Sequence, residues 1–410
     1  MPPVPNLKSA IGNRQSATIS RSSPASKPRR PIPCPSIRFP APPLVALLAG
    51  LLAAVTLFAA PSPGDLSAEA AGAPAAAGPA EGRREVLLVA GGDVTLGARL
   101  EEHLKALAAD DGTFDPHAYP FARIAHHLRA ADLALVNLEG PFTTGGKPLL
   151  KNFNFRTSPH LAAALSRAGI GAVTLANNHM MDYGPTGLQD TLGALQGEGI
   201  VAFGAGRTQA AARQGAVVER RGVRIGLLGY LFLGPNSIEP SAMFAGPRRP
   251  GVAGHPRSAE AVEAMVREDV RRLRPAADVV VVSFHWGRER RYGPEPYQQR
   301  LGRAAIDAGA LLVLGHHPHV LQGIEAYGGG LIAYSLGNFI FGGKWKPDDT
   351  DSILLKVRLR AAGVADYEVV PLTLGLYPHA PFQPVELSGS EAARVRARLA
   401  ALSAALGAPH

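Results

Sequence analysis

Six short apolar runs divide the chain between residues 86 and 334, and each is soon followed by a side chain that can bind a metal ion. The runs cover residues 86–90, 133–136, 172–176, 279–284, 311–314 and 331–334. Short apolar runs without alternation are typical of strands covered on both faces, as in α/β proteins. Sites in open α/β sheets lie beyond the carboxyl ends of the strands, so we expect the polar side chains there to converge. They belong to Asp93, Glu139, Asn178, His285, His317 and Asn338.

Helices are expected between these runs, bounded by residues such as the Ser158 cap and Gly169, which would end a helix. The last part of the chain differs. Residues 353–359 and 367–374 are predicted to form an antiparallel hairpin, followed by a helix over residues 390–406. The four earlier helices are predicted over residues 158–168, 185–196, 259–273 and 296–308. The whole pattern predicts an α/β fold.

A histidine cluster follows the fifth run, where residues 315–319 read Gly-His-His-Pro-His. Histidine supplies a neutral nitrogen ligand near pH 7. Pro318 stiffens the turn, so His317 and His319 can point the same way, as neighbours in an extended segment do not. The alternative interpretation is a His-rich surface loop. Six other histidines are interpreted as surface or structural residues, namely His103, His117, His126, His127, His255 and His379.

The net charge of +9 does not indicate a nucleic-acid-binding protein. Residues 1–43 contain seven basic and no acidic side chains, so the rest of the chain is close to neutral. No nucleic-acid partner is therefore expected. The sequence has a single cysteine, Cys34, which lies in the same basic segment. It can therefore form neither an intrachain disulfide nor a thiolate metal site in the main domain. Any metal ion must be bound by His, Asp, Glu or Asn.

The N-terminal segment predicts a membrane attachment. Residues 1–41 are expected to be a basic, disordered cytoplasmic leader, and residues 42–60 a transmembrane signal anchor. A cleaved signal peptide is the alternative, because residues 68–70 have a small-x-small pattern. Residues 61–83, rich in Ala, Pro and Gly, are predicted to be a linker. The protein is thus expected at the cell membrane, crossing it once, with its main domain extracytoplasmic.

Eight motifs follow one another along residues 85–345. They are Gly92-Asp93-Val94, Asn137-Leu138-Glu139, Asn152-Phe153-Asn154-Phe155-Arg156, Ala176-Asn177-Asn178-His179, Asp182-Tyr183-Gly184, His285-Trp286-Gly287, Gly315-His316-His317-Pro318-His319 and Tyr334-Ser335-Leu336-Gly337-Asn338-Phe339. Their order and spacing resemble those of the CapA family of capsule-synthesis proteins, which is associated with bacterial poly-γ-glutamate.

This family in turn resembles the calcineurin-like metallophosphoesterases. The resemblance implies a four-layer α-β-β-α sandwich with two mixed sheets, spanning residues 84–380 and followed by a C-terminal helix and tail over residues 381–410. It also implies one or two divalent metal ions (Mn, Zn or Fe). Their ligands would be Asp93, a bridging Glu139, Asn178 through its amide oxygen, His285, His317 and His319.

The resemblance also implies roles around the metal. His179 would act as an acid or electrostatic stabiliser, with Asp182 orienting it. Arg156 would bind an anionic group of the substrate, and Asn338 is the other candidate substrate-binding residue. One departure is clear, because metallophosphoesterases usually have a His at the position of Thr95.

Three functions follow from these patterns. The first is a membrane-tethered protein of capsule or poly-γ-glutamate biosynthesis, with an anionic polymer and a capsule synthesis and export complex as its partners. The second is a metal-dependent hydrolase of a phosphoester or amide that is unconnected with capsule. The third is a non-catalytic scaffold that binds the polymer. A shared fold alone does not decide among them.

Overall fold

The computed structural model describes residues 84–343, 347–375 and 381–407. The predicted leader, anchor and linker lie outside these residues. Among the helices of the described part, none has both the length and the apolar character needed to cross a bilayer.

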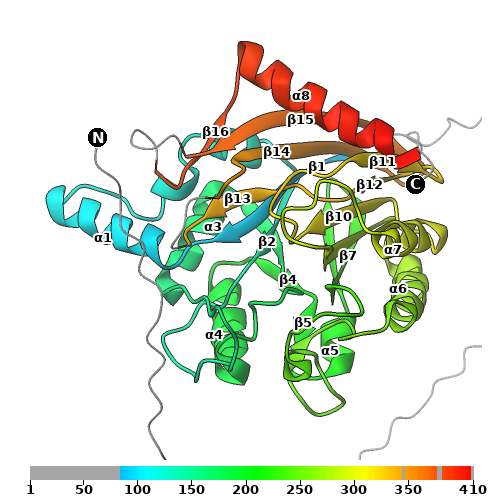
Figure 1. The fold of residues 1–410 in the computed structure, drawn as a ribbon, viewed down its shortest axis with the longest axis horizontal. Helices are drawn as coiled ribbons and strands as arrows, with labels where there is room; N and C mark the ends of the chain where they lie inside the picture. The colour runs from blue at the N-terminus through cyan, green and yellow to red at the C-terminus, as the bar shows by residue number, and fades with distance from the viewer. Residues whose placement is uncertain (1–83, 344–346, 376–380, 408–410) are drawn as a thin grey trace, which may run out of the picture. The chain divides into compact units, whose positions relative to one another are not determined.

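The larger of two sheets has eight strands, and β1 lies at its centre (Figure 1). β1 pairs in parallel with β2 and β13 and antiparallel with β14, so the sheet is mixed. The strands are β16 (Pro384–Glu386), β15 (Gly363–Leu374), β14 (Asp351–Arg360), β1 (Glu85–Thr95), β2 (Leu133–Leu138), β3 (Ile170–Thr174) and β4 (Val201–Phe203), in this order, with β13 (Asn338–Phe341) beside β1.

The second sheet has six strands and is also mixed, with β7, β9, β10 and β12 parallel to one another. Its order is β11 (Ile324–Tyr327), β12 (Gly330–Ala333), β10 (Leu312–His316), β9 (Val279–Trp286), β7 (Val223–Phe232) and β6 (Ala216–Arg220). Two short strands, β5 (Ala205–Gly206) and β8 (Gly251–Val252), form a separate pair.

The central strands β2, β9 and β10 are buried along their whole length, as the unbroken apolar runs predict. In β1, Leu88 belongs to the core between the two sheets, whereas Val89 faces the helices on the outer side. In β9, Val281 likewise faces the other sheet and Val282 faces outward. This alternation follows from the two-residue period of a strand. The mixed α/β prediction is confirmed.

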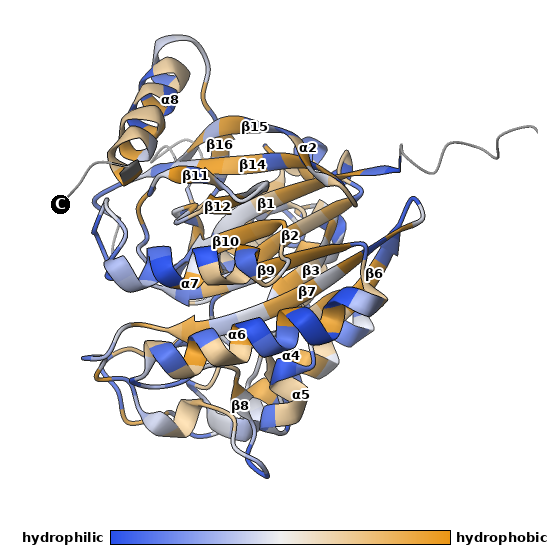
Figure 2. Cartoon of the chain, turned by 90° about the vertical axis from the view of Figure 1, so that its right-hand side faces the viewer, coloured by the Kyte–Doolittle hydropathy of each residue, from blue (hydrophilic) through white to orange (hydrophobic). Residues whose placement is uncertain are grey.

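Helices cover the two outer faces. On the larger sheet, the outer core contains residues of α1 (Arg99–Asp110), α2 (Ala125–Arg129), α3 (Ala162–Ala168) and α4 (Gly184–Gly197). On the smaller sheet, it contains residues of α5 (Gln209–Arg213), α6 (Ala259–Leu273) and α7 (Pro296–Asp307). Figure 2 shows blue, hydrophilic residues on α6 and α7 and mainly orange strands. The layers therefore run helix, sheet, sheet, helix.

The last helix, α8 (Gly389–Ala404), follows β16 and contacts β15 and β11. Its Val395 and Leu399 extend the core between the sheets. The predicted hairpin is the β14–β15 pair, and the helices predicted from residue patterns correspond to α3, α4, α6, α7 and α8. Short 3₁₀ turns complete the chain at η2 (Tyr119–Phe121), η3 (Pro159–Leu161), η4 (Ser241–Met243), η5 (Arg274–Ala276) and η6 (Ala405–Gly407).

Candidate metal centre

The candidate site lies at the carboxyl ends of strands from both sheets. In the larger sheet, Asp93 of β1 pairs with Asn137 of β2 and with Asn338, which is the first residue of β13. In the smaller sheet, His285 of β9 pairs with His316 of β10. Parallel registers thus bring polar residues from distant parts of the sequence to one edge, as expected.

A close approach of two backbones positions Asp93. A Cβ atom at Gly92 would lie 1.9 Å from the carbonyl oxygen of Gly337, so a larger residue cannot occupy this place. The Asp93 amide donates a hydrogen bond of 3.0 Å to the same carbonyl oxygen. The Asp93 carboxylate accepts one of 2.8 Å from Asn137 Nδ2 and one of 3.2 Å from the His317 amide.

The histidine turn has an unusual backbone. His317 and His319 have φ angles of 94° and 58°, a region that non-glycine residues seldom adopt and that often marks functional sites. Gly315 allows the turn to begin, because a Cβ atom there would lie 1.9 Å from the carbonyl oxygen of Tyr334. The His317 ring lies 5.6 Å from that of His319 and 4.8 Å from that of His285, measured between centroids.

Two groups of potential ligands share one carboxylate, and a third consists of the exposed Glu289 with His317 and His319. Of the two that share it, one consists of Glu139, His285 and His317, and the other of Asp93, Glu139 and His319. Within each group the ligand atoms lie within 4.8 Å of one another. Glu139 is therefore in the place of a ligand that bridges two ions.

The chemistry of these side chains fits a divalent cation. Glu139 is 2% exposed, and neither of its carboxylate oxygens has a hydrogen-bond partner among the described residues. His285 Nε2 lies 3.5 Å and His319 Nε2 lies 3.8 Å from Glu139 Oε1. A buried carboxylate without a partner is costly. Burial accordingly raises the pKa of Glu139 to about 8, and a bound cation would replace the proton.

Two of the histidines are held in the neutral form that binds metals. Burial lowers the pKa of His317 to about 3, and burial together with the nearby His317 holds the pKa of His285 well below its usual value. His319 differs. Although burial disfavours its charged form, the carboxylates of Glu139 and Asp93 raise the pKa of His319 to about 10.

Asn178 adds an oxygen to the first group. Its Oδ1 lies 2.9 Å from His285 Nε2, and its Nδ2 donates a hydrogen bond of 3.2 Å to Glu239 Oε1. Because a carboxylate only accepts, Glu239 orients the amide with its oxygen toward His285. The group of Glu139, His285 and His317 can therefore supply four protein ligands.

Thr95 contributes no ligand to the second group. Its hydroxyl donates to the Ile340 carbonyl at 3.2 Å and accepts from the Gly342 amide at 2.9 Å. The group of Asp93, Glu139 and His319 therefore has three protein ligands. His316 is fully buried, and its Nδ1 lies 3.4 Å from Asp93 Oδ1.

His179 and Asp182 form the predicted pair. His179 Nδ1 lies 2.7 Å from Asp182 Oδ2, and the His179 ring stacks on Phe155 with centroids 3.9 Å apart. Asp182 also accepts a hydrogen bond of 2.6 Å from the Phe155 amide. Burial lowers the pKa of His179 even though Asp182 acts in the opposite direction. The ring is therefore fixed in place and predominantly neutral at pH 7.

Lys151 is a buried cation that no pattern in the sequence singled out. Its side chain is 8% exposed, and its Nζ lies 3.0 Å from Asp182 Oδ1 and 3.4 Å from Glu239 Oε2. It also donates a hydrogen bond of 2.7 Å to the Asn178 carbonyl. The sequence pattern did not identify Lys151 and Glu239, because neither residue follows a predicted strand. Asn137, by contrast, stands in a recognised motif and could have been assigned.

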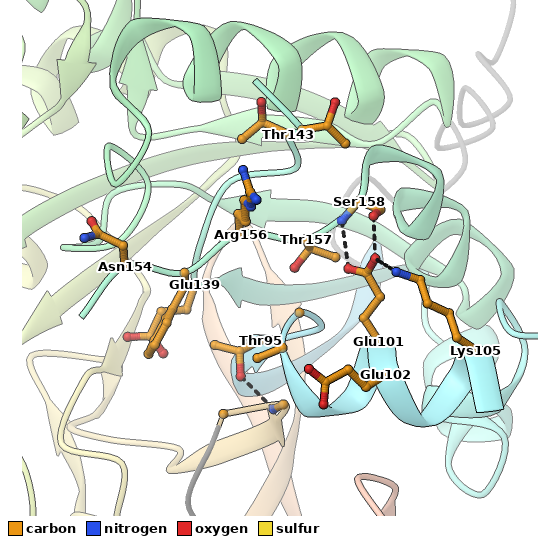
Figure 3. A pocket seen from close by; sticks show the side chains of 16 residues that line it. Thr95, Glu101, Glu102, Lys105, Glu139, Thr143, Asn154, Arg156, Thr157 and Ser158 are labelled. Atoms are coloured by element: carbon orange, nitrogen blue, oxygen red, sulfur yellow. Dashed lines mark hydrogen bonds and ion pairs between the residues drawn. The ribbon is translucent and has the colours of Figure 1, made fainter. Parts of the chain in front are cut away.

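An open cavity of about 400 Å³ adjoins Glu139. Arg156, Thr95, Thr143 and Ser158 are among the residues that line it, and Figure 3 shows Glu139 and Arg156 on its walls. Arg156 is exposed, with its guanidinium 4.9 Å from the centre of the Tyr183 ring. The same cavity is therefore lined by Arg156 and by Glu139, the carboxylate that the two ligand groups share.

Asn338 has a different environment from Arg156. It is 2% exposed and is not among the residues that line the cavity, while its Nδ2 donates a hydrogen bond of 3.2 Å to the His319 carbonyl. These contacts position the histidine turn. The assignment of Asn338 to substrate binding stays a prediction.

A family model and individual relatives of this chain indicate the same family. The family model described as bacterial capsule synthesis protein PGA_cap matches residues 87–343, which contain all ten candidate site residues. Over 286 residues the chain is 33% identical to the PGA biosynthesis protein CapA of Bacillus subtilis (strain 168), covering 69% of this chain and 70% of that protein. Over 287 residues it is 32% identical to the capsule biosynthesis protein CapA of Bacillus anthracis, covering 69% and 66%.

A third relative is the probable polyglutamine synthesis accessory protein of Mycobacterium tuberculosis (strain ATCC 25618 / H37Rv). It is 33% identical over 218 residues, which cover 52% of this chain and 56% of that protein. The chain thus spans about two thirds of the two Bacillus proteins and about half of the mycobacterial one. With a family model that matches well over half of its length, the chain belongs to the PGA_cap family of bacterial capsule synthesis proteins.

Proposed function

We propose that this protein acts in the biosynthesis of capsule, with poly-γ-glutamate or a similar anionic polymer as its substrate, at a divalent metal centre. The names of its relatives, which refer to capsule, PGA and polyglutamine synthesis, support the polymer. The observation that carries the metal centre is the buried Glu139, which is shared by two ligand groups and has no hydrogen-bond partner among the described residues.

The layer order supports a metallophosphoesterase-like domain, because two mixed sheets face each other with helices outside. Asp93, Glu139, Asn178, His285, His317 and His319 would hold one or two ions (Mn, Zn or Fe). When bound, such ions polarise a phosphoryl or carbonyl oxygen and activate water.

The protein side chains account for binding and proton transfer. Arg156 would bind a carboxylate of the polymer and keep the bond to be cleaved near Glu139. His179, which is fixed by Asp182 at its Nδ1 and by the stacked Phe155 ring, would first accept a proton on Nε2, such as one released by the attacking water. It would then pass this proton to the leaving group or stabilise the charge that develops there. Lys151 would balance the negative charge of Asp182 and Glu239.

The proposal is tested by comparing the cleavage of poly-γ-glutamate with that of an aryl phosphodiester. Wild type, His317→Ala and the surface control His160→Ala would be assayed with Mn, Zn and Fe. We expect cleavage of the polymer by wild type and His160→Ala, and none by His317→Ala. Cleavage of the phosphodiester alone would favour a metal-dependent hydrolase unconnected with capsule. Polymer binding without any cleavage would favour the non-catalytic scaffold.

We propose the location and domain organisation on the sequence alone. Residues 1–41 would be cytoplasmic, residues 42–60 would anchor the protein, residues 61–83 would be a linker, and the domain from residue 84 would be extracytoplasmic. There it would work with a capsule synthesis and export complex. Cell fractionation and protease treatment of spheroplasts test this. The domain should fractionate with membranes and be degraded from outside, and a protected domain would contradict the proposal.

A further inference from the structure

A second group of metal-ligating side chains lies on the surface, away from the site described above. His126 and His127 are in α2, and Glu386 is in β16. Their ligand atoms lie within 4.8 Å of one another. His127 Nε2 is 2.9 Å and His126 Nε2 is 3.9 Å from Glu386 Oε2.

These distances suit a tetrahedral ion. Bonds of about 2.0–2.2 Å from the metal to nitrogen and oxygen place neighbouring ligand atoms roughly 3.3–3.6 Å apart. The two separations fall on either side of this range, so small rotations of the side chains would complete the geometry. His126 and Glu386 have the freedom to move, because their side chains are 62% and 45% exposed.

The two imidazoles already lie side by side. Their ring centroids are 4.1 Å apart, although they are adjacent in the sequence and adjacent helical residues do not usually share a face. One carboxylate oxygen faces both rings. A simple hydrogen bond between histidine and glutamate needs only one ring, whereas a metal ion would use both.

The backbone around the group is fixed before any metal binds. Arg123 Nε donates a hydrogen bond of 3.0 Å to Gln383 Oε1, and Gln383 Nε2 donates one of 2.6 Å to the Tyr119 carbonyl. The Tyr119 hydroxyl donates one of 3.0 Å to the Pro381 carbonyl. The segment that precedes Glu386 is therefore held against the segment that precedes His126, which lowers the entropy cost of forming a site.

We propose that His126, His127 and Glu386 form a peripheral site for a divalent transition-metal ion such as Zn, which cross-links α2 to β16. Two imidazoles and a carboxylate are typical zinc ligands and leave one position for water. The ion would join segments that are 259 residues apart in the sequence and would fix the strand that leads into α8. Glu386 lies beyond residues 87–343, so the site would combine the family domain with the C-terminal part of this chain.

This site is tested by zinc binding to the full chain. Isothermal titration of wild type, His126→Ala and Glu386→Gln with zinc alone should give one equivalent fewer for both variants than for wild type. The control His160→Ala removes an exposed histidine whose ring lies within hydrogen-bond distance of His117, and it should bind as many equivalents as wild type. Polymer cleavage should be unchanged in all of them, so this result is separable from the proposed function.

Hydrogen exchange of residues 381–386 gives a second readout. Zinc should slow the exchange in wild type and His160→Ala but not in Glu386→Gln. Equal zinc stoichiometry in wild type, His126→Ala and Glu386→Gln would overturn the proposal and leave only a histidine–glutamate hydrogen bond. Circular dichroism establishes folding, and His126→Ala, which loses only an exposed side chain, keeps the test valid if Glu386→Gln does not fold.

Discussion

Glu139 belongs to both ligand groups, and the potential ligands on its two sides differ in number and type. On one side are His285, His317 and the amide oxygen of Asn178. On the other are Asp93 and His319, with Thr95 bonded elsewhere. Four protein ligands bind a cation more tightly than three of similar type, so the two positions should differ in affinity.

This difference predicts opposite results for two histidine variants. His319→Ala should retain one tightly bound metal equivalent, because the ligands on the other side of Glu139 remain. His285→Ala should lose the tight equivalent. Elemental analysis after dialysis against a weak chelator measures both. Equal retention in the two variants would show that the positions do not differ as described.

The orientation of the Asn178 amide depends on Glu239. Glu239→Ala removes the acceptor for Asn178 Nδ2 and should weaken metal binding by about 10- to 100-fold, as other changes behind metal ligands do. Glu239→Gln keeps an acceptor oxygen and should lose less. Metal titrations of the two variants measure the effect. Affinity in Glu239→Ala equal to that of wild type would mean that Glu239 does not orient the amide.

Single residues also show why sequence patterns find some site residues and miss others. Ligand-type residues directly after apolar runs could be predicted, because strand ends converge in α/β sheets. Lys151 and Glu239 lie in segments without such a pattern, and only the folded chain brings them within 3.4 Å of each other. The positive φ angles of His317 and His319 were likewise not predictable, since neither is a glycine.

Among the elements, β7 is one that the sequence patterns failed to indicate. It lies between β6 and β9 and is almost entirely buried, but Gly226 and Gly229 interrupt its apolar residues. A Cβ atom at Gly226 would lie 2.7 Å from Leu273 Cδ2, and one at Gly229 would lie 2.7 Å from Thr174 Oγ1. These glycines permit close packing against α6 and β3. Because glycine weakens a strand, the same residues make this segment look like a poor strand in the sequence.

The helix α8 is held to β14 by charged side chains. Asp351 is 5% exposed and accepts hydrogen bonds of 2.8 Å from Arg394 Nη1 and Nη2, and Arg398 Nη1 lies 2.5 Å from its Oδ2. Burial acts in the opposite direction, but the hydrogen bonds from Arg394 and Arg398 lower the pKa of Asp351. The ion pair therefore favours the folded state only while Asp351 is ionised.

This pairing predicts a dependence on acid. Because the folded pKa is lower than the unfolded value of 3.8, the stabilisation is complete above that value and is lost as the pH falls below it. Asp351→Asn should lower the free energy of unfolding by about 1–2 kcal/mol at pH 7 and remove this part of the acid dependence. The control is Glu391→Gln, because Glu391 is exposed and its ion pair with Arg394 does not involve Asp351.

Urea unfolding at pH 7 and pH 3 measures the free energy of unfolding of both variants. Hydrogen exchange in α8 shows whether the loss of stability affects this helix. If Asp351→Asn is as stable as Glu391→Gln at pH 7, the ion pair does not hold the helix.

At the scale of the whole molecule, the layer order explains why the site is where it is. The apolar core between the sheets leaves their carboxyl-end edge for polar residues, and strands from both sheets contribute to it. The α/β class and most helices could be predicted from apolar runs and caps. The arrangement of the second sheet could not, because β6 and β7 lack a clear pattern and pairing between distant strands leaves no local trace.

The central claim is that Glu139 is shared by bound divalent ions, and metal analysis of the full chain tests it most directly. Wild type, Glu139→Gln and the surface control His160→Ala would be purified, loaded with Mn, Zn or Fe, and analysed for bound metal and for thermal stability with and without chelator. We expect wild type and His160→Ala to retain metal and to lose stability in chelator. Glu139→Gln should remain folded, retain at least one equivalent less and respond less to chelator. Wild type that retains no more metal than Glu139→Gln, with unchanged stability in chelator, would contradict the claim.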